Sequence, residues 1–162
     1  FGGAPAFAAG AAEGFDPIVA EMLGPLVTPA GSVPRSEGGG FLVLEAESAA
    51  RARSAVRLAH IEGPWPLSPT FPAPPPRDRE RALVIVTAPS ERALAALDAC
   101  AWATCPRRSV LRATGYHEAV SGLSLAAAAA LVGVGAASEV LVVSSSERSD
   151  WVTLFRDPGT AR

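Results

Sequence analysis

The residues of this chain best suited to chemistry stand together, directly before a long alanine-rich segment. The stretch ATGYHEAVSG places a phenol, an imidazole and a carboxylate in consecutive positions, Tyr116, His117 and Glu118. An imidazole beside a carboxylate is a common pair for acid–base catalysis near neutral pH. The same residues also suit the first turn of a helix, where the helix dipole favours the Glu118 carboxylate. The residue types therefore indicate either a catalytic site or a helix start without chemistry.

Other candidate nucleophiles have weaker patterns. Ser121, His117 and Asp150 could form a Ser-His-Asp set, but the Gly-x-Ser-x-Gly turn typical of many such hydrolases is absent from the sequence. Cys100 and Cys105 are separated by four residues with no histidine nearby, so we expect reduced, mostly buried thiols and neither a metal site nor a disulfide. Every cationic residue is arginine, which excludes mechanisms that depend on lysine.

Length and composition predict one well-buried domain over residues 1–162. The chain has 162 residues, of which 49% are hydrophobic, and a formal net charge of −2. No basic stripe is present to follow a phosphate backbone, which argues against nucleic acid as a partner. The longest apolar run, residues 122–137, is interrupted and falls short of the ~20 residues of a membrane span. The cysteine usage predicts a cytoplasmic protein, and no cofactor is expected. Without an initiator Met or a basic leader, we expect the chain to begin partway through a longer domain.

Apolar periodicity predicts alternating strands and helices around a layered α/β core. The glycine-rich stretch after the first helix is expected to be a loop, and the polar residues between the last two strands a hairpin or a tight crossover. The first predicted strand is also compatible with a helix. Strands are expected at 5–12, 41–46, 56–63, 82–87, 109–114, 139–145 and 151–156, and helices at 15–23, 47–55, 90–103 and after the GYHE turn.

A proline-rich stretch over residues 64–81 predicts an extended connector outside the core. Its arginine-rich end, RDRER, is expected to be a solvated turn, with an acidic carrier protein as a less favoured partner for these arginines. His60 falls on an alternating segment, which favours a surface or interface position over a ligand role. The three tryptophans, Trp65, Trp102 and Trp151, are expected to anchor the core or an interface.

Four segments follow one another in an order known from one enzyme family. AAGAAEGFDPIVAEML resembles a Gly-Gly-Ala-(Asp/Glu)-Glu strand and helix, and EGGGFLVLE resembles a Gly-Glu-Gly-Ala-Gly-hydrophobic-Leu-Glu segment. ESAARARSAVRLAHIEG is similar to a Glu-x-x-x-Ala-x-x-Arg-Gly-Ala helix and strand, and SVLRATGYHEAVSG to a Ser-x-Lys-x-x-x-Gly-His-x-x-x-Ala-Ser-Gly segment. These motifs belong to the β-ketoacyl synthases, the condensing enzymes of fatty acid and polyketide synthesis. The resemblance implies a layered thiolase-like α/β sandwich, here the C-terminal half of a ketosynthase fold.

The catalytic positions that the resemblance implies are changed in this chain. The family uses a cysteine nucleophile, whose segment would precede residue 1, and two histidines. After residues 82–87 the sequence has APSE where the family has Asn-x-His-Gly-Thr-Gly-Thr. Leu111 takes the place of the motif Lys and Tyr116 that of the second His, with His117 one position later. SSSERSD replaces a glycine-rich turn, so we expect no catalytic residue, with His117 as a weak candidate.

These replacements predict a non-catalytic subunit that resembles the chain length factors. By the resemblance, such a subunit forms a heterodimer with an active β-ketoacyl synthase, shapes its acyl cavity and meets an acyl carrier protein. The partner would be a catalytic ketosynthase subunit or this chain's own N-terminal half, because half a sandwich exposes apolar faces and sheet edges. One alternative is an active condensing acyltransferase that uses His117 with a cysteine from a missing half or a partner. Another is a stand-alone structural or acyl-binding protein of the same fold.

Overall fold

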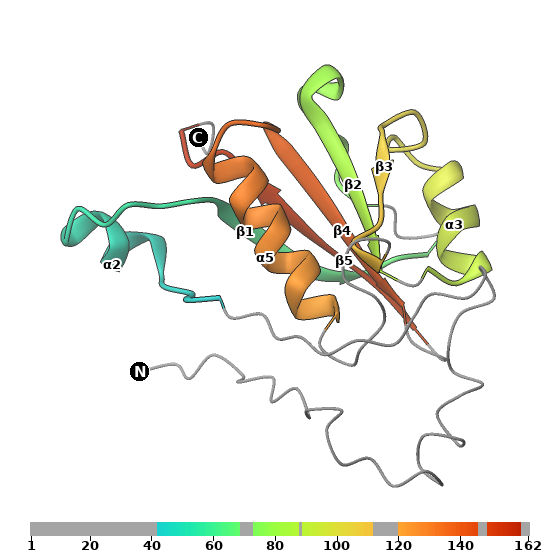
Figure 1. The fold of residues 1–162 in the computed structure, drawn as a ribbon, viewed down its shortest axis with the longest axis horizontal. Helices are drawn as coiled ribbons and strands as arrows, with labels where there is room; N and C mark the ends of the chain where they lie inside the picture. Colours follow the sequence, from blue (N-terminus) through green and yellow to red (C-terminus); the bar gives the residue numbers. More distant parts are fainter. Residues whose placement is uncertain (1–41, 69–72, 88, 112–119, 146–148, 160–162) are drawn as a thin grey trace, which may run out of the picture.

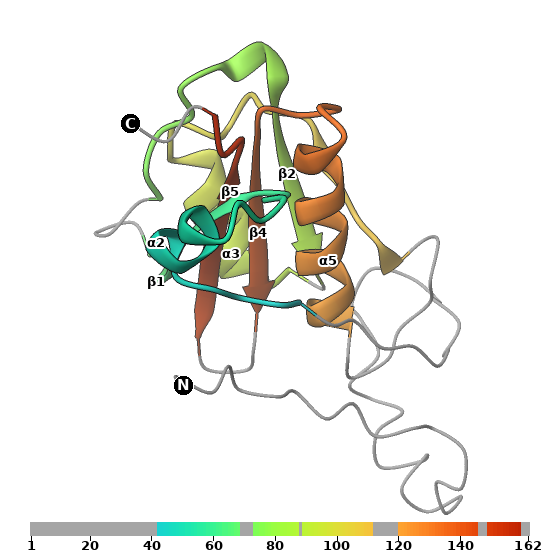
Figure 2. The same cartoon turned by 90° about the vertical axis from the view of Figure 1, so that its left-hand side faces the viewer.

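A computed structural model of the chain describes residues 42–68, 73–87, 89–111, 120–145 and 149–159. In these residues five strands form one mixed sheet in the order β1-β5-β4-β2-β3, with helices on both of its faces (Figures 1 and 2). The strands are β1 (His60–Pro66), β2 (Ala82–Thr87), β3 (Arg107–Arg108), β4 (Glu139–Ser145) and β5 (Asp150–Arg156). The helices are α2 (Glu47–Ala52), α3 (Glu91–Asp98) and α5 (Val120–Gly133), with a short 3-10 turn, η2 (Arg79–Arg81).

The centre of the sheet is formed by the most apolar strands. β2 and β4 pair in parallel, and their near-continuous apolar sequences, ALVIVT and EVLVVSS, are those of strands covered on both faces. β5 pairs antiparallel with β4 from Ser145↔Asp150 to Glu139↔Arg156, which is a hairpin register. The predicted strands at 82–87 and 139–145 are confirmed, and so is the hairpin to the following strand.

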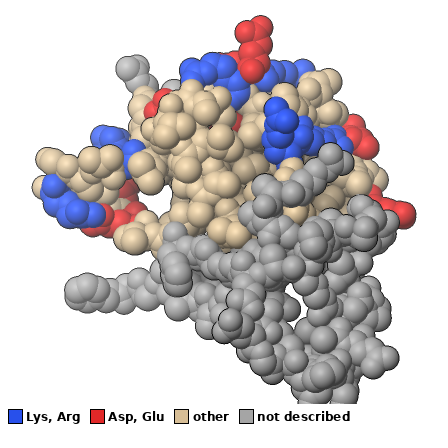
Figure 3. All heavy atoms as spheres, viewed as in Figure 1, with Lys and Arg blue, Asp and Glu red and all other residues tan. Residues whose placement is uncertain are grey.

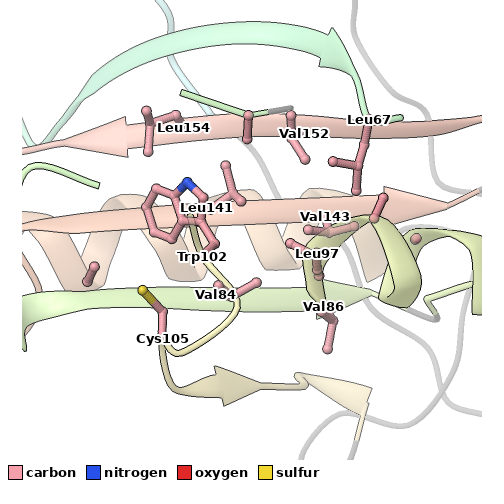
Figure 4. Close-up of a cluster of buried hydrophobic side chains, with 14 residues drawn as sticks. Leu67, Val84, Val86, Leu97, Trp102, Cys105, Leu141, Val143, Val152 and Leu154 are labelled. Atoms are coloured by element: carbon pink, nitrogen blue, oxygen red, sulfur yellow. The ribbon is translucent and has the colours of Figure 1, made fainter. Parts of the chain in front are cut away.

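Alternate side chains of the central strands enter two separate clusters. Val84 and Val86 point to the α3 side, where they meet Leu97 and the fully buried Trp102 (Figure 4). Ile85, between those two valines, points to the α5 side. Alternation with a period of two residues is what a pleated strand imposes, so one strand supplies both clusters. The result is a layered arrangement of helix, sheet and helix, which confirms the predicted α/β class.

The α5 layer is built from small side chains. Ala128, Ala129 and Val132 are buried against the sheet, and Phe155 from β5 fills the space beside them. Alanines allow the helix to lie close to the strands, because only a methyl group separates the two backbones. The predicted alanine-rich helix is therefore confirmed, with one face in the core. No helix in the described residues is long and apolar enough to cross a membrane.

The first turn of α3 is fixed by a serine cap. The Ser90 hydroxyl accepts a hydrogen bond from the Ala93 amide at 3.0 Å, which satisfies one of the unpaired amides of the helix N-terminus. The helix ends at Asp98, five residues before the predicted end at residue 103, and turns lead on toward Trp102. α2 likewise is shorter than the predicted helix over 47–55.

Three predicted strands differ from the structure. Residues 42–46 belong to no helix or strand and pair with no described strand. The strand predicted at 56–63 begins at His60, where pairing with β5 starts. Ser109, Val110 and Leu111 lie outside any strand, because the pairing of β3 with β2 ends at Arg108. Predictions at 5–12, 15–23, 112–114 and the loop 24–40 lie outside the described residues.

The proline-rich connector is partly inside the core, contrary to prediction. Pro64 and Pro66 belong to β1, and Leu67 and Ala73 are buried in the α3-side cluster. The carbonyl of Pro74 accepts a hydrogen bond from the Trp102 indole at 2.7 Å. Prolines at an edge strand leave no ladder amide unpaired, so the fold accommodates them there. The RDRER end is exposed, as the solvated-turn prediction requires.

Candidate functional site

Polar residues from three strand ends and from the start of α3 lie together at one end of the sheet. Thr87 ends β2 and Ser145 ends the parallel strand β4, while Asp150 opens β5 beside them. Ser90, at the start of α3, reaches this edge as well. The carboxyl ends of parallel strands are where α/β proteins usually place their ligands, because the loops that follow can diverge there. This edge is therefore the candidate site.

Asp150 is the charged centre of the site. Its side chain is 0% exposed and accepts hydrogen bonds from the Ser90 hydroxyl at 2.9 Å and the Arg92 guanidinium at 2.5 Å. The Ser145 hydroxyl accepts from the Ser90 amide at 3.2 Å. Burial raises the pKa of Asp150, but the hydrogen bonds from Arg92, Ser145 and Ser90 outweigh it and hold that pKa below its ordinary value. The carboxylate is therefore ionised and fully engaged, which suits a structural tie better than a general base.

A second buried polar contact joins β2 to α5. The Thr87 and Ser124 hydroxyl oxygens are 2.5 Å apart, and the two residues are 3% and 0% exposed. Ser124 donates its only hydroxyl proton to the Val120 carbonyl at 2.9 Å, so Thr87 is the donor to Ser124. A serine that gives its proton to a helix carbonyl, with no base beside it among the described residues, is not an activated nucleophile. The pair instead fixes how close α5 lies to the end of β2.

Of the three site residues predicted from the sequence, only Leu111 lies in the part of the chain that the structure describes. Leu111 is buried, 6% exposed, and its amide donates to the Ser109 hydroxyl at 3.3 Å. Tyr116 and His117 lie outside the described residues, so their roles remain predictions. Of the weaker Ser-His-Asp set, Asp150 is already held by the α3 residues and Ser121 lies in the first turn of α5.

The remaining candidate ligands lie elsewhere. His60 is at the opposite end of β5 from Asp150, opposite Arg156, with its ring nitrogens 3.9 Å from carboxylate oxygens of Glu47 and Glu62. This confirms the partly exposed position that its alternating segment predicted. Within the described residues no group of three His, Cys, Asp or Glu side chains could hold a metal ion.

The two cysteines are free, as predicted, and neither resembles a nucleophile. Burial raises the pKa of the Cys105 thiol, which keeps it protonated and unreactive near neutral pH. Cys100 is partly buried and its thiol donates to the Leu97 carbonyl at 3.2 Å. Of the tryptophans, Trp102 is a core residue and Trp65 packs on the same cluster. Trp151 is 43% exposed and so is not a core residue, and its interface role stays a prediction.

Sequence reasoning missed a buried ion network at the other end of the sheet. Arg156 pairs with Glu139 at 2.8 Å and with Glu62 at 2.6 Å, and the backbone amides of Arg77 and Asp78 donate to Glu139 at 2.6 and 3.1 Å. Burial acts to lower the pKa of Arg156, but its hydrogen bonds and charge interactions with Glu139 and Glu62 outweigh burial and hold that pKa above its ordinary value. The sequence contained one signal for this network. Glu139 begins the first strand of the predicted hairpin and Arg156 ends the second, so equal pairing of the two strands places them opposite each other.

Comparisons of the chain with protein families, with curated proteins and with solved structures found no match.

Proposed function

We propose that this chain is a non-catalytic, chain-length-factor-like subunit that pairs with an active β-ketoacyl synthase in fatty acid or polyketide synthesis. One observation carries the proposal. The loop after β2, where the resemblance implies a catalytic histidine, and the β4–β5 turn, where it implies glycines, meet at the same end of the sheet. At that end the fully buried Asp150 side chain accepts hydrogen bonds from Ser90 and from the half-exposed Arg92.

The chemistry of that contact opposes catalysis of condensation. Decarboxylation of a malonyl group and attack on a thioester both develop negative charge, which needs hydrogen-bond donors that are free to meet it. At this end of the sheet the Ser90 hydroxyl and Arg92 Nε are already directed at the Asp150 carboxylate. A buried anion also disfavours a second negative charge beside it. A scaffold role is consistent with this arrangement, because a scaffold needs the fold and not the free donors.

The architecture supports the proposal independently of the site. A helix on each face of a mixed sheet is compatible with the layered sandwich that the resemblance implies. Of the segments that carry the four motifs, the third reaches β1, and the fourth ends in the first turn of α5. A non-catalytic member of a condensing pair would keep this layering while losing the catalytic side chains.

Reconstitution with a catalytic partner tests the proposal. The chain is purified alone and together with a β-ketoacyl synthase catalytic subunit of the same organism, and each preparation is supplied with malonyl groups on the matching acyl carrier protein. We expect no condensation by the chain alone, and in the pair a product chain length that differs from that of the catalytic subunit alone. An unchanged product in the presence of a stable complex, or no complex at all, would contradict the proposal.

A histidine replacement separates this function from the active-enzyme alternative. In the assembled complex, His117→Ala is expected to leave the condensation rate within about twofold of the wild type, because the reacting groups belong to the other subunit. His60→Ala is the matched control, since it removes the chain's other imidazole far from the candidate site. A loss of about 100-fold or more for His117→Ala alone would favour the active enzyme instead.

A further inference from the structure

His60 lies between two carboxylates that belong to different elements of the fold. Its Nδ1 is 3.9 Å from Oε2 of Glu47, the first residue of α2, and its Nε2 is 3.9 Å from Oε1 of Glu62 on β1. His60 is itself the first residue of β1, which is an edge strand of the sheet. The imidazole therefore stands between α2 and the sheet edge, with a carboxylate oxygen beside each ring nitrogen.

Few contacts between described residues hold α2 to the sheet. α2 stands away from the sheet, and the chain returns from it to begin β1 (Figure 1). α2 makes no extensive contact with any other described helix or strand, whereas Leu58, on the return, lies against Gly133 of α5. The Glu47 carboxylate contacts Arg57 at 3.2 Å and faces the His60 ring. These two contacts join α2 to the residues that lead into β1, so their strength affects how firmly α2 is held.

The charged form of the imidazole matches this position better than the neutral form does. A neutral imidazole has one N–H donor and one nitrogen lone pair, so one of its nitrogens would present a lone pair to a carboxylate oxygen. The imidazolium has an N–H on both nitrogens and a positive charge. Both 3.9 Å distances exceed the length of a hydrogen bond, which is about 2.7–3.2 Å. Protonation of the ring therefore favours a closer approach of α2 to β1.

On the α2 side, arginines share the carboxylate with the imidazole. Arg51 and Arg57 contact Oε1 of Glu47 at 2.5 and 3.2 Å, whereas Oε2 faces the ring. Figure 3 shows side chains of both charges next to one another on this projecting part of the surface. The hydrogen bond and the charge of Arg51 are the main reasons why the pKa of Glu47 lies below its ordinary value. Glu47 is therefore ionised throughout the range in which an imidazole ordinarily titrates.

On the sheet side, the second carboxylate also has an arginine partner. Oε1 of Glu62 contacts Arg156 at 2.6 Å, and this arginine lies across from His60 on β5. The charge of Arg156 is balanced in turn by Glu139 at 2.8 Å. Because both carboxylates beside the imidazole are already paired with arginines, the attraction that an imidazolium gains from them is modest. We therefore expect a severalfold effect of protonation rather than a large one.

We propose that His60 is a pH-sensitive clasp, which holds α2 and the following residues up to 58 more firmly to β1 when its imidazole is protonated. The observation that carries the proposal is one carboxylate oxygen beside each ring nitrogen, one from α2 and one from the sheet edge. Between about pH 8 and about pH 5.5 the imidazole is the side chain whose charge ordinarily changes. The clasp concerns this chain alone and does not depend on the ketosynthase-like function.

Amide hydrogen exchange tests the clasp. The exchange rates of the hydrogen-bonded amides in residues 47–58 are measured from about pH 8 to about pH 5.5 and divided into the intrinsic rates at each pH, which gives a protection factor. For the wild type we expect this protection to rise about threefold to tenfold as the pH falls, because two partly exposed ion pairs each contribute only a few-fold. His60→Gln keeps a polar side chain that cannot titrate, and its protection factors should not rise.

A matched pair of glutamate variants identifies the partner on α2. Glu47→Gln removes the carboxylate that faces the ring, so most of the rise in protection should be lost. Glu45→Gln removes a carboxylate that contacts Arg53 at 2.7 Å, and this variant is expected to keep the rise. Equal behaviour of the two variants would show that the Glu47 contact does not hold α2.

The pattern of exchange decides whether the clasp exists. A wild-type protection that does not change with pH, or a rise that persists in His60→Gln, would overturn the proposal. The same rise in the amides of β2 and β4 would also overturn it, because it would report the stability of the whole domain. If His60→Gln does not fold, Glu47→Gln decides alone, since Glu47 lies outside both buried clusters.

Discussion

The two ends of the β4–β5 hairpin each hold a buried carboxylate paired with an arginine, but the arginines differ in exposure. At the candidate site Asp150 is 0% exposed while the Arg92 side chain is 51% exposed. At the opposite end Arg156 and Glu139 are 6% and 3% exposed. When both side chains of an ion pair are buried, breaking the pair leaves a buried charge without a counter-charge. When the arginine is half exposed, water solvates its guanidinium after the pair is broken. The Arg156–Glu139 end of the hairpin, here called the locked end, is therefore costly to change. The Asp150–Arg92 end, here called the adjustable end, costs less to change.

The adjustable end is also the end at which the resemblance to the ketosynthases predicts the catalytic loops of that family. Asp150 is tied to α3 through Ser90 and Arg92, so the β4–β5 turn and the start of α3 move together. The Arg156 end is tied to the backbone of the connector as well, through the amides of Arg77 and Asp78. A scaffold fixed at the far end can accept replacements at the site end without losing its fold.

The largest expected effect is at the locked end. Arg156→Met leaves the Glu139 carboxylate buried with only backbone donors, and we expect a loss of about 3–5 kcal/mol in the free energy of unfolding. Arg92→Met is the comparison at the site end, with an expected loss of about 1–2 kcal/mol, because Ser90 still donates to Asp150 there. Urea unfolding followed by circular dichroism measures both. Equal losses for the two variants would remove the distinction between the ends.

An intermediate effect is expected at Asp150 and depends on pH. The folded-state pKa of Asp150 lies below its unfolded value of about 3.9, so its stabilising contribution is present above that pH and is lost as pH falls through the folded pKa. At pH 7 Asp150→Asn should cost about 1–3 kcal/mol, because it removes the charged partner of Arg92.

Urea unfolding of the wild type and of Asp150→Asn, measured from pH 7 to pH 2, checks the direction of this pH dependence. The stability gap between wild type and Asp150→Asn should narrow as the solution becomes acidic. Asp98→Asn is the matched control, since Asp98 also pairs with an arginine but its side chain is 65% exposed, and its effect should be small at every pH. A gap that is constant with pH would show that the Asp150 charge does not stabilise the fold.

The smallest of the three effects is at the hydroxyl pair beneath the site. Ser124→Ala leaves the buried Thr87 hydroxyl without the acceptor it uses, and we expect a loss of about 1–2 kcal/mol. Thr87→Val added to Ser124→Ala should recover part of that loss, because no buried donor then lacks a partner. The double-mutant cycle in urea unfolding gives the coupling energy. Additive losses would show that the two hydroxyls do not depend on one another.

Local sequence patterns predicted the elements that are covered on both faces. The apolar run at 82–87 and the one at 139–145 are strands with the predicted bounds, and Ser90 caps the helix that follows. These features depend on neighbours in the chain, such as period-two alternation and a hydroxyl three residues before an amide. The same reasoning failed for the strand predicted at 41–46: residues 42–46 belong to no helix or strand, since strand-forming residues do not by themselves specify a neighbour to pair with.

Part of the candidate site could be anticipated and part could not. The resemblance to the ketosynthases predicted that the loop after 82–87 and the turn after 139–145 lie where that family has catalytic loops. Their meeting at one edge follows from the parallel pairing of β2 with β4, which no local pattern specifies. Tyr116 and His117, the residues with the clearest chemistry, lie outside the described residues and remain predictions.

By itself the sequence determined the apolar runs, the helix cap and the arginine-only cation set, because each depends on residues near one another in the chain. Only the tertiary structure decided that Asp150 joins Ser90 and Arg92, and that Arg156 closes on Glu139 and Glu62. The physical reason is that a charge can be buried only where the fold brings its partners within hydrogen-bond distance. The number of residues between two charged side chains in the sequence does not specify the distance between them in the fold.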